Sequence, residues 1–179
     1  MIDLLEATSP TDIQTVQELF REYEQFLQVD LCFQQFEAEL AGLPGKYALP
    51  RGALLLATES GAAVGCVAIR PLGETVCEMK RLYIRPAYLG LGIGRRLATA
   101  VIDKARDAGY LHMVLDTLDK LKPALALYRS LGFAERPAYY ENPLPGVIYM
   151  ELNLSQRTSS VYGVKSANPP GAVVDPTAG

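Results

Sequence analysis

The sequence has no tryptophan, a single histidine and only three cysteines among its 179 residues. Protein zinc sites are usually built from several cysteines and histidines at short spacings. Cys32, Cys66 and Cys77 lie far apart, and His112 has no second histidine to join it. We therefore expect no metal site, and we interpret the cysteines as buried structural thiols rather than as a disulfide framework. For His112 we expect a surface or packing role.

An excess of positive charge is also absent, because 17 Lys and Arg stand against 20 Asp and Glu, a net charge of −3. This balance gives no basic field for binding nucleic acid. The chain has no apolar run long enough to span a membrane, and the acidic residues of the opening MIDLLEATSPTD do not match a signal peptide. We therefore expect a cytoplasmic protein with neither a nucleic acid nor a membrane as its partner.

Local patterns predict an order of elements that mixes helices and strands. Ser9 followed by Pro10 is typical of a helix start, and apolar residues at helical spacing continue to Leu27. We predict helices at about 9–27, 33–40, 93–109 and 122–130, and strands at 2–7, 53–59, 62–72, 76–86, 111–118, 133–140 and 146–154. Short turns join the strands from 53 to 86, which predicts an antiparallel meander. The fold class is therefore mixed α/β.

The chain is long enough for one domain, which we place at residues 1–154. Residues 155–179 contain no Leu, Ile or Phe and are rich in Ser, Pro and Gly. Such a composition cannot bury a sizeable core. We therefore expect a flexible tail after the domain.

The stretch LGLGIGRRL sets Gly90, Gly92 and Gly94 at every second position between a predicted strand and a predicted helix. It differs from a dinucleotide-binding fingerprint, which would have glycine in place of Arg95, and it lacks the Lys-Ser/Thr ending of a P-loop. A glycine turn that opens a helix nevertheless presents free N–H groups and the positive end of the helix dipole. A pyrophosphate would fit there. The alternative is that the glycines serve only the turn and close helix packing.

The order EMKRLYIRP, LGLGIGRRL, a strand ending in Asp116, and ALALYRSLGF resembles the GNAT superfamily of N-acetyltransferases. The resemblance is strongest over residues 76–133 and extends in element order over most of 1–154. It implies a central, mostly antiparallel mixed sheet of six to seven strands, flanked by about four helices and splayed between the fourth and fifth strands. It also implies acetyl-CoA as the co-substrate.

The resemblance further implies which residues bind the cofactor. Backbone N–H groups of residues 91–95 would hold the CoA pyrophosphate, and the main chain of the strand before them would pair with the pantetheine arm. The implied cofactor-binding residues are Leu82, Tyr83, Ile84, Leu89, Gly90, Leu91, Gly92, Ile93, Gly94 and Arg95. Two positions depart from the family pattern. Leu89 stands where the family usually has Arg or Gln, and Leu121 stands where it often has Asn.

Acetyl transfer to an amine requires a group that removes a proton from the amine and a group that protonates the leaving thiolate. The resemblance points to Glu78 as the general base and to Tyr128 as the general acid. Strand alternation would put Glu78, Lys80, Leu82 and Ile84 on one face. As alternatives, Glu78 forms a surface ion pair with Lys80 or Arg81, and Tyr128 only packs between helix and sheet.

The acceptor pocket is expected where the loop YYENPLPG meets the junction of the first two helices. Its candidate residues are Asp30, Phe33, Phe36, Asp116 and Tyr140; core packing, or capping of a turn by Asp116, is the alternative. We expect transfer of an acetyl group to a primary amine, on a small molecule or a peptide, by direct attack in a ternary complex. The alternative is a non-catalytic module that binds or senses acyl-CoA. A homodimer would be consistent with the resemblance, although no residue argues for it.

Overall fold

The structure is a computed structural model, and it describes residues 1–31 and 35–155. Its helices are α1 (Pro10–Leu27), α2 (Phe36–Ala41), α3 (Ile93–Asp107) and α4 (Lys122–Ser130), with short 3-10 turns at Gly45–Tyr47 and Pro86–Tyr88. Its strands are β1 (Ile2–Glu6), β2 (Ala53–Glu59), β3 (Ala62–Pro71), β4 (Val76–Ile84), β5 (His112–Leu118), β6 (Ala134–Arg136) and β7 (Val147–Asn153).

These strands form one seven-stranded sheet in the order β1-β2-β3-β4-β5-β7-β6, and every neighbouring pair is antiparallel except β4 and β5. The predicted mixed α/β fold is therefore confirmed. β6 is shorter than predicted, because Pro137 follows it and has no N–H to continue the ladder. The predicted N-terminus of α1 is confirmed in detail: Ser9 and Asp12 form a reciprocal capping box.

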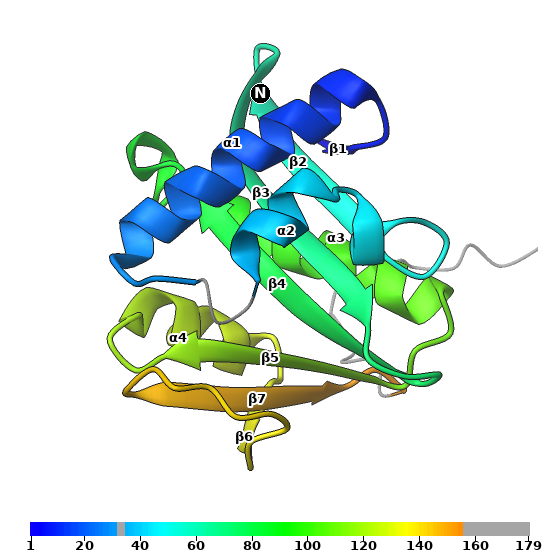
Figure 1. The fold of residues 1–179 in the computed structure, drawn as a ribbon, viewed down its shortest axis with the longest axis vertical. Coiled ribbons are helices and arrows are strands. Elements are labelled where there is room, and N and C mark those ends of the chain that lie inside the picture. Colours follow the sequence, from blue (N-terminus) through cyan, green and yellow to red (C-terminus); the bar gives the residue numbers. More distant parts are fainter. Residues whose placement is uncertain (32–34, 156–179) are drawn as a thin grey trace, which may run out of the picture.

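The sheet has a hydrophobic core on each face. α1 and α2 cover one face, and α3 lies behind the other (Figure 1). The core on the α3 face includes Leu97, Val101 and Met113, and the core on the α1 face includes Phe20 and Leu56. Within the described ranges, no helix combines the length and the apolar character needed to cross a membrane.

β4 and β5 separate soon after they begin. Their parallel pairing runs only from Val76 with His112 to Glu78 with Val114. The rest of β4 and the rest of β5 diverge, and this confirms the predicted splay. Their facing backbone edges are therefore available to a ligand rather than to each other.

A β-bulge at Arg81 changes which side chains of β4 share a face. Arg81 has a positive φ of 59°, and the register with β3 shifts at this point. Met79 lies in the core on the α3 face and Leu82 packs against that same core, three residues later instead of two. A bulge inserts one extra residue and so reverses the alternation beyond it. The expectation that Glu78, Lys80, Leu82 and Ile84 share one face is therefore wrong: Glu78 and Lys80 face the α1 side, whereas Leu82 and Ile84 face the α3 side.

Candidate active site

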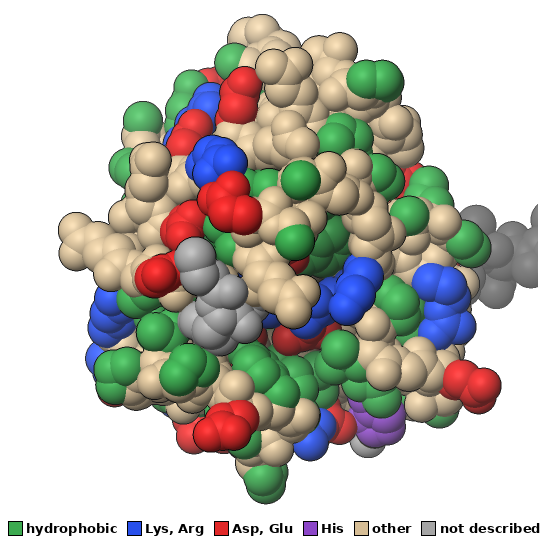
Figure 2. Space-filling view, viewed as in Figure 1, with side chains coloured by type: hydrophobic (Ala, Val, Ile, Leu, Met, Phe, Trp, Pro, Cys, Tyr) green, Lys and Arg blue, Asp and Glu red, His purple; other side chains and the backbone are tan. Residues whose placement is uncertain are grey.

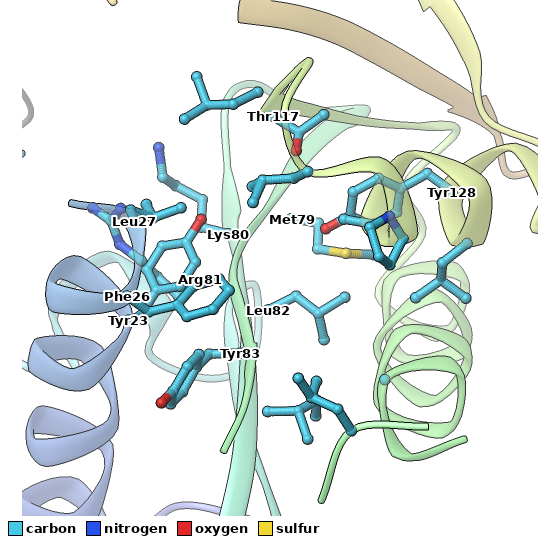
Figure 3. A pocket seen from close by; sticks show the side chains of 18 of the residues that line it. Tyr23, Phe26, Leu27, Met79, Lys80, Arg81, Leu82, Tyr83, Thr117 and Tyr128 are labelled. Atoms are coloured by element: carbon cyan, nitrogen blue, oxygen red, sulfur yellow. The ribbon is translucent and has the colours of Figure 1, made fainter. Parts of the chain in front are cut away.

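A cavity of about 660 Å³ occupies the splay between β4 and β5. Figure 3 shows β4 running through its middle, with α1 on one side and α4 on the other. The cavity therefore has two halves, one on each side of β4. Side chains of α1 and the Asn142–Leu144 loop line the first, and residues of α3 and α4 line the second.

The N-terminus of α3 opens into the second half. Gly90 and Gly92 have φ values of 80° and 75°, in the left-handed region that favours glycine, and Gly92 is the N-cap. The first helical bond runs from Arg96 N–H to Gly92 O, so the preceding N–H groups have no acceptor within the helix. The helix has no side-chain cap and no acidic residue in its first turn. These features together suit an anion.

All the predicted cofactor-binding residues except Leu91 line this cavity. Leu91 is 63% exposed and does not line the cavity, although its backbone belongs to the glycine turn. Gly94 lies where β4 and α4 come close: a Cβ there would be 3.8 Å from Ile84 and 3.6 Å from Leu127. Leu89 is 58% exposed on the rim and supplies no polar group.

Tyr128 projects from α4 toward Met79 and Leu82 on β4 (Figure 3). Its ring packs against Phe133 with ring centroids 5.7 Å apart, and 8% of the residue remains exposed. Burial raises the pKa of the Tyr128 hydroxyl above its ordinary value. The group is therefore neutral and able to donate a proton throughout the neutral range.

Glu78 lies behind the cavity wall rather than on it, and only 1% of the residue is exposed. Both of its oxygens have partners. Arg70 Nε lies 2.7 Å from Oε2, and the Tyr139 hydroxyl donates to Oε1 at 2.7 Å. Lys80 Nζ lies 3.6 Å from Oε1. A ligand in the cavity therefore reaches Glu78 only through another group.

Lys80 and Asp116 lie on the cavity wall, one on each side of the splay. Lys80 Nζ lies 3.9 Å from Asp116 Oδ1, while Oδ2 accepts hydrogen bonds from the Tyr140 hydroxyl at 2.7 Å and from Asn142 Nδ2 at 2.9 Å. Burial lowers the pKa of Lys80, and the nearby carboxylates of Glu78 and Asp116 act in the opposite direction. Figure 2 shows basic and acidic side chains together at the centre of this face, over the space between β4 and β5 and beside hydrophobic side chains.

The predicted acceptor residues are only partly brought together. Asp116 lines the cavity, and Tyr140 reaches it by bonding to Asp116. Phe36 instead packs in the core, with its ring centroid 5.2 Å from the Arg81 guanidinium. Asp30 is exposed and lies off the cavity wall, and Phe33 lies outside the described residues.

Much of the α1 half of the cavity was not assigned to a site from the sequence. The missed residues are Tyr23, Phe26, Leu27, Leu31, Lys80 and Asn142. Tyr23, Phe26 and Leu27 share one face of α1 at helical spacing. That spacing is the same whether the face meets a core or a cavity, so no sequence signal separates the two.

Cys66, Cys77 and His112 do not line the cavity. Cys66 and Cys77 are buried free thiols, and Cys32 lies outside the described residues. His112 begins β5, and its Nδ1 is 2.9 Å from Glu151 Oε1. Within residues 1–31 and 35–155, no group of three His, Cys, Asp or Glu side chains is arranged to hold a metal ion.

Comparison with known proteins gives consistent matches over the same region. The model of the acetyltransferase (GNAT) family matches residues 13–133. An uncharacterised N-acetyltransferase of Schizosaccharomyces pombe is 46% identical over 149 residues, which cover 82% of this chain and 91% of the relative. A crystal structure from Klebsiella pneumoniae, described as an acyl-CoA N-acyltransferase, has a TM-score of 0.69 and 29% identity over 86% of this chain and 98% of its own. A Salmonella typhimurium structure, described as an acetyltransferase with its cofactor acetyl-CoA, has a TM-score of 0.65 and 21% identity over 88% of this chain and 96% of its own.

Proposed function

The chain belongs to the acetyltransferase (GNAT) family, and on this premise we propose that it transfers an acetyl group from acetyl-CoA to a primary amine by direct attack in a ternary complex. One observation carries the proposal. The uncapped N-terminus of α3, the unpaired edge of β4 and the Tyr128 hydroxyl all border a single cavity that is also open toward α1. Donor and acceptor can therefore meet from opposite sides of β4.

The second half of the cavity, which residues of α3 and α4 line, is the donor half in this proposal, and it suits CoA. The free N–H groups at the start of α3 would bind the pyrophosphate, and Gly90 and Gly92 leave the approach clear because no side chain stands there. The edge of β4 beyond Glu78 would hydrogen-bond the amides of the pantetheine arm, as an added strand would. Acetyl-CoA supplies an activated thioester when bound.

The bulge in β4 offers a donor for the thioester carbonyl. The register pairs Lys80 with Ala68 and Tyr83 with Cys66, and between them neither Arg81 nor Leu82 has a Cα partner on β3. A backbone N–H near Leu82 would stabilise the oxyanion as the amine nitrogen attacks the carbonyl carbon. When the C–S bond then breaks, the Tyr128 hydroxyl would give its proton to the sulfur.

The attacking amine must lose a proton, and two carboxylates lie on its side of β4. Asp116 is on the cavity wall and is the one that an acceptor can contact directly. Because Glu78 is buried behind the wall, its predicted role as the base requires a relay, by a water molecule or through Lys80. We propose that the proton leaves toward Asp116 and reaches Glu78 by such a relay.

A panel of primary amines with acetyl-CoA tests the proposed function, with release of free CoA thiol and mass of the product as readouts. We expect turnover with at least one class of amine and tight binding of CoA in calorimetry. CoA binding without turnover on any amine would instead favour a sensing module. No CoA binding at all would contradict the proposal.

Two variants test the path of the proton. If Glu78 is reached by a relay, Glu78→Gln should lower kcat/KM most at low pH, where the amine is protonated. Asp116→Asn should show the same trend. A constant ratio of variant to wild type across pH would contradict the role of that carboxylate in proton removal.

A further inference from the structure

The α1 half of the cavity has an apolar wall. Tyr23, Phe26 and Leu27 contribute one face of α1, and Leu31 continues it beyond the helix. Tyr83 on β4 packs beside this wall, with its ring centroid 6.1 Å from Tyr23 and 6.0 Å from Phe26 (Figure 3). Burial of apolar surface against such a wall is favourable. The acceptor that fits here therefore carries an apolar or aromatic group.

The floor of the same half carries a separated pair of charges. Lys80 Nζ and Asp116 Oδ1 are 3.9 Å apart, too far for a hydrogen bond, and both side chains line the cavity. Among the described residues, the hydrogen bonds that Asp116 accepts all end on Oδ2, from Tyr140 and Asn142. Oδ1 is therefore the oxygen left to receive an amine. Lys80 Nζ lies beside it; burial lowers the pKa of Lys80, but Glu78, Asp116 and a bound carboxylate all favour its charged form.

The charge balance of this floor limits what it can bind. Arg70 and Lys80 already balance Glu78 and Asp116, since each is paired within this cluster. A simple ammonium ion would add an excess positive charge to a buried site, close to the like charge of Lys80. A ligand with both an ammonium and a carboxylate adds no net charge and offers a partner to each side.

We propose that the acceptor is a free α-amino acid with an apolar or aromatic side chain, its carboxylate bound by Lys80, its amine by Asp116 and its side chain by the wall of α1. The inference rests on the proposed acetyl transfer and names its substrate class. A peptide N-terminus fits less well, because an amide there replaces the carboxylate that Lys80 would bind.

Matched pairs of acceptors test this without any variant. We expect kcat/KM for leucine and phenylalanine to exceed that for leucinamide and phenylalaninamide by at least about tenfold, because the amides leave Lys80 without its partner. Glycine should be a poor acceptor, since it has no side chain to contact α1.

A lysine variant then assigns the preference to its cause. Lys80→Met should bring the ratio of acid to amide close to one. Lys104→Met is the control: Lys104 Nζ is 2.7 Å from Glu6, away from the cavity, and the variant should keep the wild-type ratio. Melting temperatures report on folding, and if Lys80→Met does not fold, the comparison of acids with amides in the wild type decides alone.

The results separate this inference from the proposed function. Efficient acetylation of the amides or of 2-phenylethylamine, with no advantage for the free acids, would overturn the substrate class and leave acetyl transfer intact. An acid preference that survives in folded Lys80→Met would overturn the role of Lys80. Failure to acetylate any of these acceptors or any other primary amine would contradict the proposed function itself, and this inference with it.

Discussion

Replacing Tyr128 by Phe separates catalysis from stability more cleanly than other changes in this site. The hydroxyl is the only group removed, and among the described residues the structure gives it no hydrogen-bond partner. The ring that packs on Phe133 is kept. We therefore expect the free energy of unfolding to change by less than about 1 kcal/mol.

The effect on the reaction should be far larger. Loss of a general acid typically lowers the rate by about 10² to 10⁴, which corresponds to roughly 3–5.5 kcal/mol of activation free energy. Because burial raises the pKa of Tyr128, the wild-type hydroxyl stays protonated across the neutral range, so this loss should not vary with pH there.

The assay is kcat at saturating acetyl-CoA and acceptor, with calorimetry of CoA binding and a thermal melt on the same samples. We expect unchanged CoA affinity and unchanged melting. A Tyr128→Phe enzyme that folds normally and retains the wild-type kcat would refute the assignment of Tyr128 as the acid.

Three further perturbations test other parts of the structure. Gly92→Glu should abolish CoA binding in calorimetry. The control is Gly109→Glu beyond the other end of α3, at an equally open left-handed position (φ 85° against 75° at Gly92), and it should bind CoA normally. Loss of binding in both variants would point to backbone strain instead. Glu78→Gln should lower the free energy of unfolding in urea by about 3 kcal/mol, because it breaks the buried ion pair with Arg70. Glu135→Gln, in the exposed pair with Arg129, should lower it by less than about 1 kcal/mol. Equal losses would contradict the reasoning. Burial raises the pKa of Tyr23 to about 12, against roughly 10 in the unfolded chain, so its contribution to stability is complete below pH 10 and is lost as the pH rises through about 12. Urea unfolding between about pH 9 and 12 should show a smaller alkaline loss of stability in Tyr23→Phe than in the wild type, and an equal loss in both would contradict the role of Tyr23; other buried tyrosines such as Tyr128 keep their own contribution in the variant.

The order of elements and the glycine turn that opens α3 were predictable because backbone features determine them. Gly90 and Gly92 mark left-handed positions, and a helix that starts after them exposes its N–H groups whatever the other side chains are. The splay and the position of Tyr128 followed from the resemblance of this region to a known family. Each of these features is encoded by residues that lie close together in the sequence, so a local pattern is enough to predict it.

The α1 half of the cavity was less predictable, because the contacts that shape it join residues far apart in the sequence. Glu78 is held by Tyr139, 61 residues away, and Asp116 by Asn142, 26 residues away. Neither spacing gives a local signal. The bulge at Arg81 could not be predicted from the sequence either, because arginine is not a residue type that indicates a positive φ. Simple strand alternation, which takes no account of a bulge, therefore predicted that Glu78 and Leu82 share a face.

The bulge gives the site its two-sided arrangement. Before it, Lys80 faces α1 and the α1 half of the cavity; after it, Leu82 and Ile84 face α3 and the half lined by α3 and α4. A single strand therefore supplies a charged side chain to one half and a free backbone edge to the other. In our proposal the edge would bind the pantetheine arm through main-chain atoms, which most substitutions leave unchanged, whereas the α1 half of the cavity presents side chains such as Lys80, Asp116 and Phe26. We therefore expect substitutions in that half to change the acceptor while binding of acetyl-CoA is retained.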